Sequence, residues 1–293
     1  MSVRFCVLGS GSKGNATLVT TPHLHLLIDA GLPPDELERR MDGTGASWKS
    51  LDAILLTHTH SDHVRKKCLA YCAANDVQFI CHKRHAHSLS GRYLTKVEEA
   101  GLLRTYVEDE VIELKPAAAT PKGAYAHTPL RIRPVALPHD ADPTFGFHID
   151  VHLKPSEEHP QSDERRLRLA YVADCGTAND ALMKTLSDVD LLALEFNHDE
   201  EMELNSGRPD FLIERVLSDE GHLSNAQAAE VLSHVLKHNG NGGPKFLIQL
   251  HLSEECNTER LAYSAAQDVV KATSAQTKIF SSRQHQRGTI HVL

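Results

Sequence analysis

Short apolar runs separated by turn residues dominate the start of the chain and predict strands rather than long helices. Successive strands are expected at Val3–Leu8, Ala16–Thr20 and Leu24–Asp29. Similar runs predict further strands at Ala53–Thr57, Val77–Cys81, Leu130–Leu137, Thr144–Val151, Leu167–Ala173, Leu191–Glu195, Phe246–Leu250 and Thr289–Val292. Helical composition or spacing predicts helices at Pro33–Met41, Asp62–Ala74, Asn179–Leu186, Pro209–Leu217, Asn225–His238 and Thr258–Ala272.

Two stretches between predicted strands have the composition of loops. Lys115–Thr128 is rich in Pro, Ala and Gly, and Lys154–Arg166 is polar and charged. Both are expected to be surface insertions rather than domain linkers, because neither separates two self-contained runs of elements. We therefore expect one α/β domain over residues 1–293.

A glycine-rich segment, "VLGSGSKGNATLV", matches the GxGxxG pattern of dinucleotide-binding proteins at Gly9, Gly11 and Gly14. In such proteins the third glycine opens a helix that holds the pyrophosphate. Here the following residues read as a strand, and no GK[ST] follows for a phosphate loop of the Walker type. The segment predicts a tight hairpin with glycines at positive φ, or a loop of small residues at the rim of a site.

Four potential metal ligands crowd into "LLTHTHSDHV", directly after a predicted buried strand. His58 and His60 alternate onto one side of an extended segment, and Asp62 and His63 turn into the next predicted helix, where Asp62 is also a natural cap. Ligand sites of α/β proteins lie at the carboxyl ends of strands. Such a cluster can surround two adjacent metal ions.

Three later residues also stand at the ends of predicted strands. His139 follows the predicted strand Leu130–Leu137. Asp174 ends the strand "LAYVAD", and His251 ends the strand "LIQLH". Singly, each reads most simply as a satisfied polar residue. Together, each at the end of an apolar strand and in this order after HxHxDH, they become stronger candidates for the partners that half of a binuclear site needs.

The order of these residues resembles the metallo-β-lactamase superfamily over essentially the whole chain. The segments "GSGSKGNATLV", "LLIDAG", "THTHSDH", "LEFNHD", "GHLSNAQAA" and "HLSEECN" are similar to its YycJ/WalJ-like branch, which is linked to 5′→3′ DNA exonuclease activity. The resemblance implies an αββα sandwich, in which two mixed sheets are flanked by helices and the site lies at one edge.

The resemblance also implies roles for individual residues. One ion would bind His58, His60 and His139, the other would bind Asp62, His63 and His251, and Asp174 would bridge the two. Asp29 would buttress from below the loop of residues 58–63, here termed the histidine loop. The ions would be zinc or manganese, with iron also compatible, because the ligands are nitrogen and oxygen without thiolate.

The chain departs from the pattern HxHxDHxxG, because Lys66 stands where the branch often has glycine. No ligand is lost by this change. Three basic stretches, Arg65–Lys67, Lys83–Arg84 and Arg165–Arg168, are candidate grips for a phosphate backbone. A run such as Arg65–Lys67 also reads as a solvated helix face.

We expect Asp62, Asp174, His198 and His222 to take part in catalysis. His198 and His222 would contact the substrate phosphate or donate a proton to the leaving group, or else they would hydrogen-bond the loops around the site. Glu195, at the end of a predicted strand, is the weaker candidate.

Composition narrows the class of protein. The net charge of −8 argues against adhesion to nucleic acid through bulk charge, although metals and local basic patches can attract a nucleic-acid substrate. No apolar run approaches the ~20 residues of a membrane span, and the amino terminus lacks a secretory pattern. Six scattered cysteines predict reduced, mostly buried thiols, and Cys68 and Cys72 lack a second pair for a zinc site. We therefore expect a cytoplasmic protein that has neither a membrane partner nor a nucleotide cofactor. The sequence does not decide between a monomer and a homo-oligomer.

The function expected from these features is a binuclear metal-dependent phosphodiesterase, with 5′→3′ exonuclease action on DNA and a hydroxide between the ions as nucleophile. The interval from Asp174 to His251 is too short for the large clamp domain of related nucleic-acid-processing enzymes. A small-molecule hydrolase of cyclic phosphodiesters, esters or lactones is the alternative. A non-catalytic metal-binding protein is disfavoured by the full ligand set.

Overall fold

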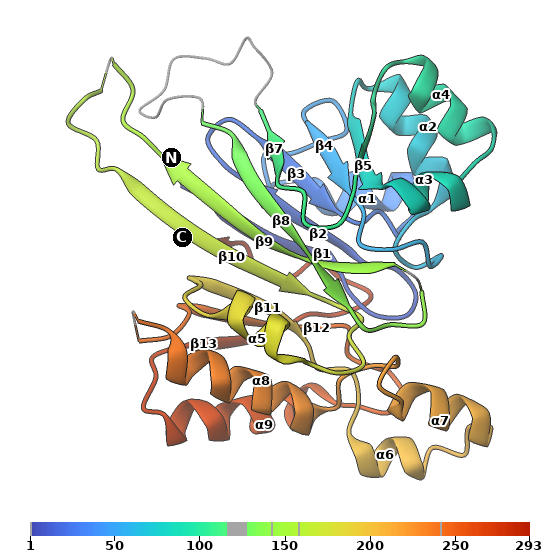
Figure 1. Cartoon of the computed structure of the whole chain (residues 1–293), viewed down its shortest axis with the longest axis vertical. Coiled ribbons are helices and arrows are strands. Elements are labelled where there is room, and N and C mark those ends of the chain that lie inside the picture. The colour runs from blue at the N-terminus through green and yellow to red at the C-terminus, as the bar shows by residue number, and fades with distance from the viewer. Residues whose placement is uncertain (1, 116–127, 142, 158, 241) are drawn as a thin grey trace.

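The fold consists of two mixed β-sheets packed face to face, with helices on both outer faces (Figure 1). The computed structural model describes residues 2–115, 128–141, 143–157, 159–240 and 242–293. The first sheet has the order β14-β1-β2-β3-β4-β5-β6 and the second the order β13-β12-β11-β10-β9-β8-β7. This arrangement confirms the predicted αββα sandwich.

The strands of the first sheet are β1 (Arg4–Gly9), β2 (Ala16–Thr20), β3 (His25–Ile28), β4 (Ala53–Leu55), β5 (Gln78–His82), β6 (Leu103–Tyr106) and β14 (His291–Val292). Those of the second are β7 (Ile112–Leu114), β8 (Leu130–Leu137), β9 (Thr144–Leu153), β10 (Arg165–Val172), β11 (Leu191–Glu195), β12 (Phe246–Leu250) and β13 (Lys278–Ser281). Each sheet has an antiparallel half and a parallel half. In the second sheet, β10 to β13 run parallel, so their carboxyl ends share one edge.

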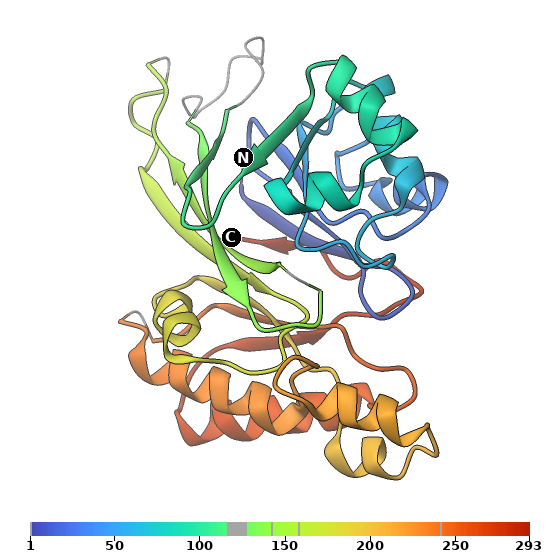
Figure 2. The same ribbon diagram turned by 45° about the vertical axis from the view of Figure 1, so that its right-hand side comes forward.

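Helices cover the outer faces of both sheets. The first sheet carries α1 (Pro34–Met41), α2 (Lys66–Ala74), α3 (Lys83–Ser88) and α4 (Arg92–Glu99), and the second carries α5 (Asp180–Leu186), α8 (Asn225–His238) and α9 (Glu259–Ala272). Two further helices, α6 (Glu200–Leu204) and α7 (Asp210–Leu217), lie together at the end of the second helical layer (Figure 2). No helix in the described ranges is long and apolar enough to cross a membrane.

Three apolar clusters correspond to the three interfaces between layers. One fills the space between the sheets, with Phe145, Phe147 and Tyr171 among its largest side chains. The others lie between each sheet and its helices. All six cysteines are buried and free, as predicted.

Most predicted elements are present with small shifts at their ends. Four strands have the predicted bounds: β2, β8, β11 and β12. The short elements α3, α4, α6, β6, β7 and β13 were not predicted. The stretch Lys154–Arg166 does connect β9 to β10, although its last two residues belong to β10, while the other predicted insertion, Lys115–Thr128, falls almost wholly on residues 116–127, outside the described residues.

The helix predicted over Asp62–Ala74 is wrong in its first turn. It begins at Lys66 after Arg65, and Asp62 does not cap it. The backbone of the preceding segment is instead tied to the end of β3, since Ala30 N–H donates to the His63 carbonyl and Arg65 N–H donates to the Ala30 carbonyl. This pairing holds residues 62–65 outside the helix.

The glycine-rich segment forms a hairpin loop, as predicted, because β1 and β2 pair antiparallel on either side of it. Gly11 and Gly14 have φ of +140° and +154°, whereas Gly9 does not have positive φ. The loop packs against the segment after β3, where Gly31 N–H donates to the Asn15 carbonyl at 2.9 Å. It also reaches the histidine loop, because Asn15 N–H donates to the Asp62 carbonyl at 2.7 Å.

Gly31 allows the closest approach between these segments. A Cβ at this position would lie 1.6 Å from the carbonyl oxygen of Asp62, which no side-chain movement could relieve. We expect Gly31→Ala to lower the free energy of unfolding by about 3 kcal/mol, at the upper end of overpacking costs. Urea denaturation measures this change. Gly240→Ala, where nothing lies within 4 Å, is the matched control, and equal stability of the two variants would contradict the argument.

Candidate metal centre

The loop after β4 is fixed from below by the buried carboxylate of Asp29. This carboxylate accepts hydrogen bonds from Thr57 N–H at 2.9 Å, from the Thr57 hydroxyl at 2.9 Å, and from Nδ1–H of His63 at 2.7 Å. The buttressing role predicted for Asp29 is confirmed. Because Nδ1 of His63 is bound to Asp29, its Nε2 faces the space above.

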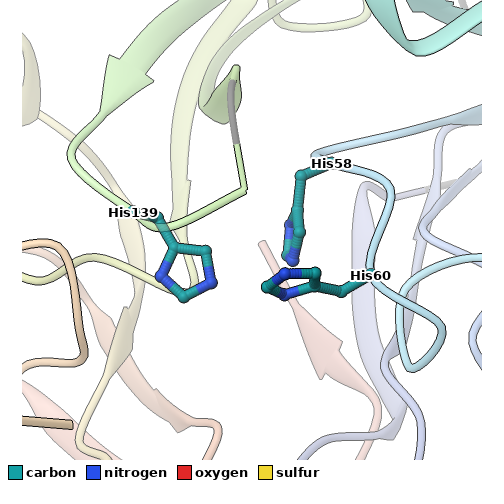
Figure 3. Close-up of side chains that lie close together, drawn as sticks. All are labelled: His58, His60 and His139. Carbon is teal, nitrogen blue, oxygen red and sulfur yellow. The ribbon is translucent and has the colours of Figure 1, made fainter. Parts of the chain in front are cut away.

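The remaining predicted ligands come from the facing sheet. His139 follows β8, Asp174 follows β10, and His251 follows β12. Asp174 and His251 have φ of +56° and +53°, unusual for residues other than glycine, and both occur just after a strand ends. Figure 3 shows His58 and His60 on one loop pointing toward His139 on another.

The structure brings the candidate ligand atoms into four overlapping groups, in each of which all atoms lie within 4.8 Å of one another. The groups are His58, His60 and His139; Asp62, His63 and His251; His58, His63 and Asp174; and Asp174, Glu195, His222 and His251. All seven predicted ligands belong to at least one group. Their coordination of metal stays a prediction, but the donor set supports the use of divalent metal.

Histidine ring nitrogens that make no hydrogen bond show whether these residues could bind a metal ion. In the described part of the chain, the Nε2 atoms of His58, His139 and His251 are buried and make no hydrogen bond. The other ring nitrogen is held in place in two clear cases, since Nδ1–H of His139 donates to the Gly221 carbonyl at 3.0 Å and Nδ1 of His58 lies 3.1 Å from the Thr57 hydroxyl. Nε2 of His139 faces a carboxylate at 3.3 Å and Nε2 of His251 faces carboxylates at 3.4 Å and 3.5 Å, in each case without a hydrogen bond. Buried nitrogens without hydrogen bonds are costly, so a ligand for them is expected.

The electrostatics divide the histidines, because His58 and His60 favour the neutral form while His63 and His251 favour the charged form. Despite burial, neighbouring carboxylates led by Asp174 raise the pKa of His63 well above its usual value and that of His251 to about 9. Burial, with His63 nearby, lowers the pKa of His58 well below its usual value, and burial also lowers the pKa of His60. Burial would raise the pKa of Asp174, but His251 and His63 hold it well below its usual range. Neutral imidazole and carboxylate are the forms that bind metal.

Glu195 belongs to this site more firmly than the sequence indicated. Its carboxylate is buried and accepts N–H bonds from Cys175 at 2.9 Å and Leu223 at 3.1 Å. The other oxygen accepts Nδ1–H of His222 at 2.8 Å. His222 also lies 3.5 Å from Asp174, so its ring is oriented at the edge of the cluster.

His198 lies outside the four groups. Its side chain is buried, and neither ring nitrogen has a hydrogen-bond partner in the described ranges. Its backbone pairs with Ser224 beside α8. The catalytic role predicted for His198 stays a prediction.

Three further residues contact the cluster and received no role from the sequence. Asn15 places Nδ2 at 2.9 Å from Nε2 of His63, and Asn197 places Nδ2 at 3.0 Å from Nδ1 of His251. Asp140 lies 3.3 Å from Nε2 of His139 and also pairs with Arg215. The sequence offered a signal for Asp140, which stands beside His139, and for Asn197, which follows the strand that ends at Glu195, whereas Asn15 reaches the cluster through tertiary packing.

Comparison with known proteins agrees with this architecture. A family model described as "Beta-lactamase superfamily domain" matches residues 25–239. The chain is 29% identical over 269 residues to the exodeoxyribonuclease WalJ of Streptococcus pneumoniae serotype 2 (strain D39 / NCTC 7466), which covers 89% of this chain and 85% of that protein. It is 27% identical over 281 residues to the exodeoxyribonuclease YycJ of Bacillus anthracis, covering 92% and 90% of the two chains.

A solved structure supports the fold independently. The metallo-β-lactamase fold protein YhfI from Bacillus subtilis is similar with a TM-score of 0.65 at 14% identity, over 100% of both chains. The family model spans more than half of this chain. The chain therefore belongs to the β-lactamase superfamily and has the metallo-β-lactamase fold.

Proposed function

We propose that this metal-dependent hydrolase is a phosphodiesterase that digests DNA as a 5′→3′ exonuclease and uses two divalent ions. Two relatives at 29% and 27% identity, matched over most of their length, are named exodeoxyribonucleases. The site offers the nitrogen and oxygen ligands that zinc, manganese or iron takes. Residues 1–293 would act as one domain without a clamp.

The observation that carries the proposal is the position of Asp174 between two sets of ligands. It groups with His58 and His63 on one side and with His251 on the other. One ion would be held by His58, His60 and His139, and the second by Asp62, His63 and His251. The carboxylate of Asp174 would serve both.

When bound, such ions activate water near neutral pH and stabilise the charge that develops on a phosphodiester. The chain supplies the orientation. Asp29 holds His63 so that Nε2 points into the site, and Glu195 holds His222 through Nδ1–H. With both ring nitrogens protonated, His222 would donate its Nε2 proton to the leaving oxygen. Its side chain, 16% exposed, is the most exposed of the group formed by Asp174, Glu195, His222 and His251.

The three basic residues after the histidine loop, Arg65–Lys67, differ in how freely they can contact DNA. Arg65 is engaged with backbone, since its guanidinium donates to the Gly31 carbonyl at 2.9 Å and to the Lys13 carbonyl at 3.4 Å. Lys66 and Lys67 are exposed at the start of α2 and have no ion pair in the described residues. These two lysines are therefore available to meet a phosphate backbone.

A small-molecule phosphodiester or ester hydrolase is the second candidate. The net charge of −8 favours it, because a negative surface repels long polyanions more than small substrates. Under either function, we infer a cytoplasmic location, since all six cysteines are free.

Metal content tests the binuclear site without any substrate. We expect two Zn²⁺ or Mn²⁺ per chain after dialysis, measured by mass spectrometry of the metal. Asp174→Ala should lose at least one ion, because it removes the shared carboxylate. His234→Ala, on the outer helix α8, is the control and should keep both. One ion per wild-type chain would contradict the binuclear proposal.

Digestion of linear 5′-phosphorylated DNA, labelled at either end, tests substrate and polarity. With Mn²⁺ we expect ordered release of nucleotides from the 5′ end. Asp174→Ala should slow it by roughly three orders of magnitude, because bound metal supplies several kcal/mol of transition-state stabilisation. Intact DNA beside cleavage of bis(p-nitrophenyl) phosphate would favour the small-molecule hydrolase.

Salt dependence tests the lysine grip. The double variant Lys66→Ser and Lys67→Ser should raise KM for long DNA and reduce the slope of log KM against log salt by about 1 to 2, one phosphate contact per lysine. Cleavage of bis(p-nitrophenyl) phosphate should not change. Lys237→Ser, exposed on α8, is the control. An unchanged slope in the double variant would rule this grip out.

A further inference from the structure

Residues 199–220, which contain α6 and α7 and are here termed the acidic arm, carry most of the net charge of the chain. The arm has eight acidic residues and two arginines, a net charge of −6 out of −8. Its exposed acids are Glu200, Glu201, Asp210, Glu214, Asp219 and Glu220. This concentration makes the arm a distinct electrostatic surface.

The same arm exposes large apolar side chains. Leu204, Phe211 and Leu217 are 61%, 71% and 38% exposed, and they are three of the six exposed large hydrophobics in the described residues. Single exposed apolar residues are ordinary, but three of them within one arm that also carries most of the net charge indicate a candidate interaction site. Phe211 is the most exposed of the six.

Both arginines of the arm are used to hold it in place. Arg208 binds the buried Glu203 at 3.1 Å and Glu255 at 2.8 Å, and Arg215 pairs with Asp140. The end of α7 is fixed as well, since His222 N–H donates to the Val216 carbonyl at 3.0 Å. The outward face therefore keeps its acids uncompensated by the arginines of the arm.

The negative charge of the arm determines which class of molecule could bind to it. A phosphate backbone would be repelled by the acids, and the free lysines Lys66 and Lys67 lie on another element, α2. A segment with basic side chains around apolar ones matches both features of the arm. Basic amphipathic helices have this composition.

We propose that the acidic arm docks a partner protein through a basic amphipathic segment, with Phe211 as the central apolar contact. Burial of Phe211 and Leu204 would supply affinity, while the acids would speed association and exclude acidic partners. A docked partner lies beside the metal centre, because Arg215 contacts Asp140 and Asp140 lies 3.3 Å from Nε2 of His139.

The test uses the full chain and a synthetic amphipathic peptide of about 15 residues made of leucine and lysine, long enough to form a helix. Calorimetry at low salt should show binding that weakens as salt rises. A leucine and glutamate peptide of the same pattern should not bind. Phe211→Ala and Glu214→Lys should each weaken the leucine and lysine peptide at least tenfold, while Tyr263→Ala, 45% exposed on α9, should not.

Other outcomes would overturn the proposal. Equal affinity of Phe211→Ala and wild type would place the peptide elsewhere. Slower DNA digestion by Phe211→Ala with unchanged peptide binding would assign the arm to substrate. A dimer that light scattering detects in wild type but not in Phe211→Ala would assign it to a second copy of the chain. Peptide binding is read without DNA, so the test does not depend on the proposed nuclease function.

Discussion

The carboxylate of Asp29 is the contact on which the geometry of the site depends. It is fully buried and gathers N–H and O–H of Thr57 and Nδ1–H of His63. A buried charge is tolerated only with such partners. By fixing the backbone before His58 and the ring of His63, it determines where the histidine loop points.

The second determinant is that the ligands are divided between the two sheets. His58, His60, Asp62 and His63 follow β4 of the first sheet, while His139, Asp174 and His251 follow strands of the second. Packing between the sheets therefore sets the distances within each ligand group. Bound metal would in turn join the sheets, so binding and closure of the sandwich are coupled.

The sequence predicted what depends on local pattern and on the order of motifs. The strands at β2, β8, β11 and β12 were predicted to the residue, because β2, β11 and β12 are short apolar runs with clear borders and β8 begins with alternating apolar and basic residues. The clustering of His139, Asp174 and His251 with the histidine loop followed from their place at strand ends. The predicted start of α2 at Asp62 was wrong, because Arg65 N–H donates to the Ala30 carbonyl, a long-range contact that no local pattern reveals. The contact of Asn15 with His63 and the full role of Glu195 were beyond prediction for the same reason, while Asn197 stood where the sequence placed the site but received no role.

The pairing of β14 with β1, Arg4 opposite Val292, has a consequence for synthesis on the ribosome. Until residues 291–292 emerge, β1 is an open edge whose N–H and C=O groups can pair with another chain. His251 also emerges late, so the ligand set is incomplete over nearly the same interval. The nascent chain therefore keeps this edge of β1 open to pairing with another chain until residues 291–292 have left the ribosome.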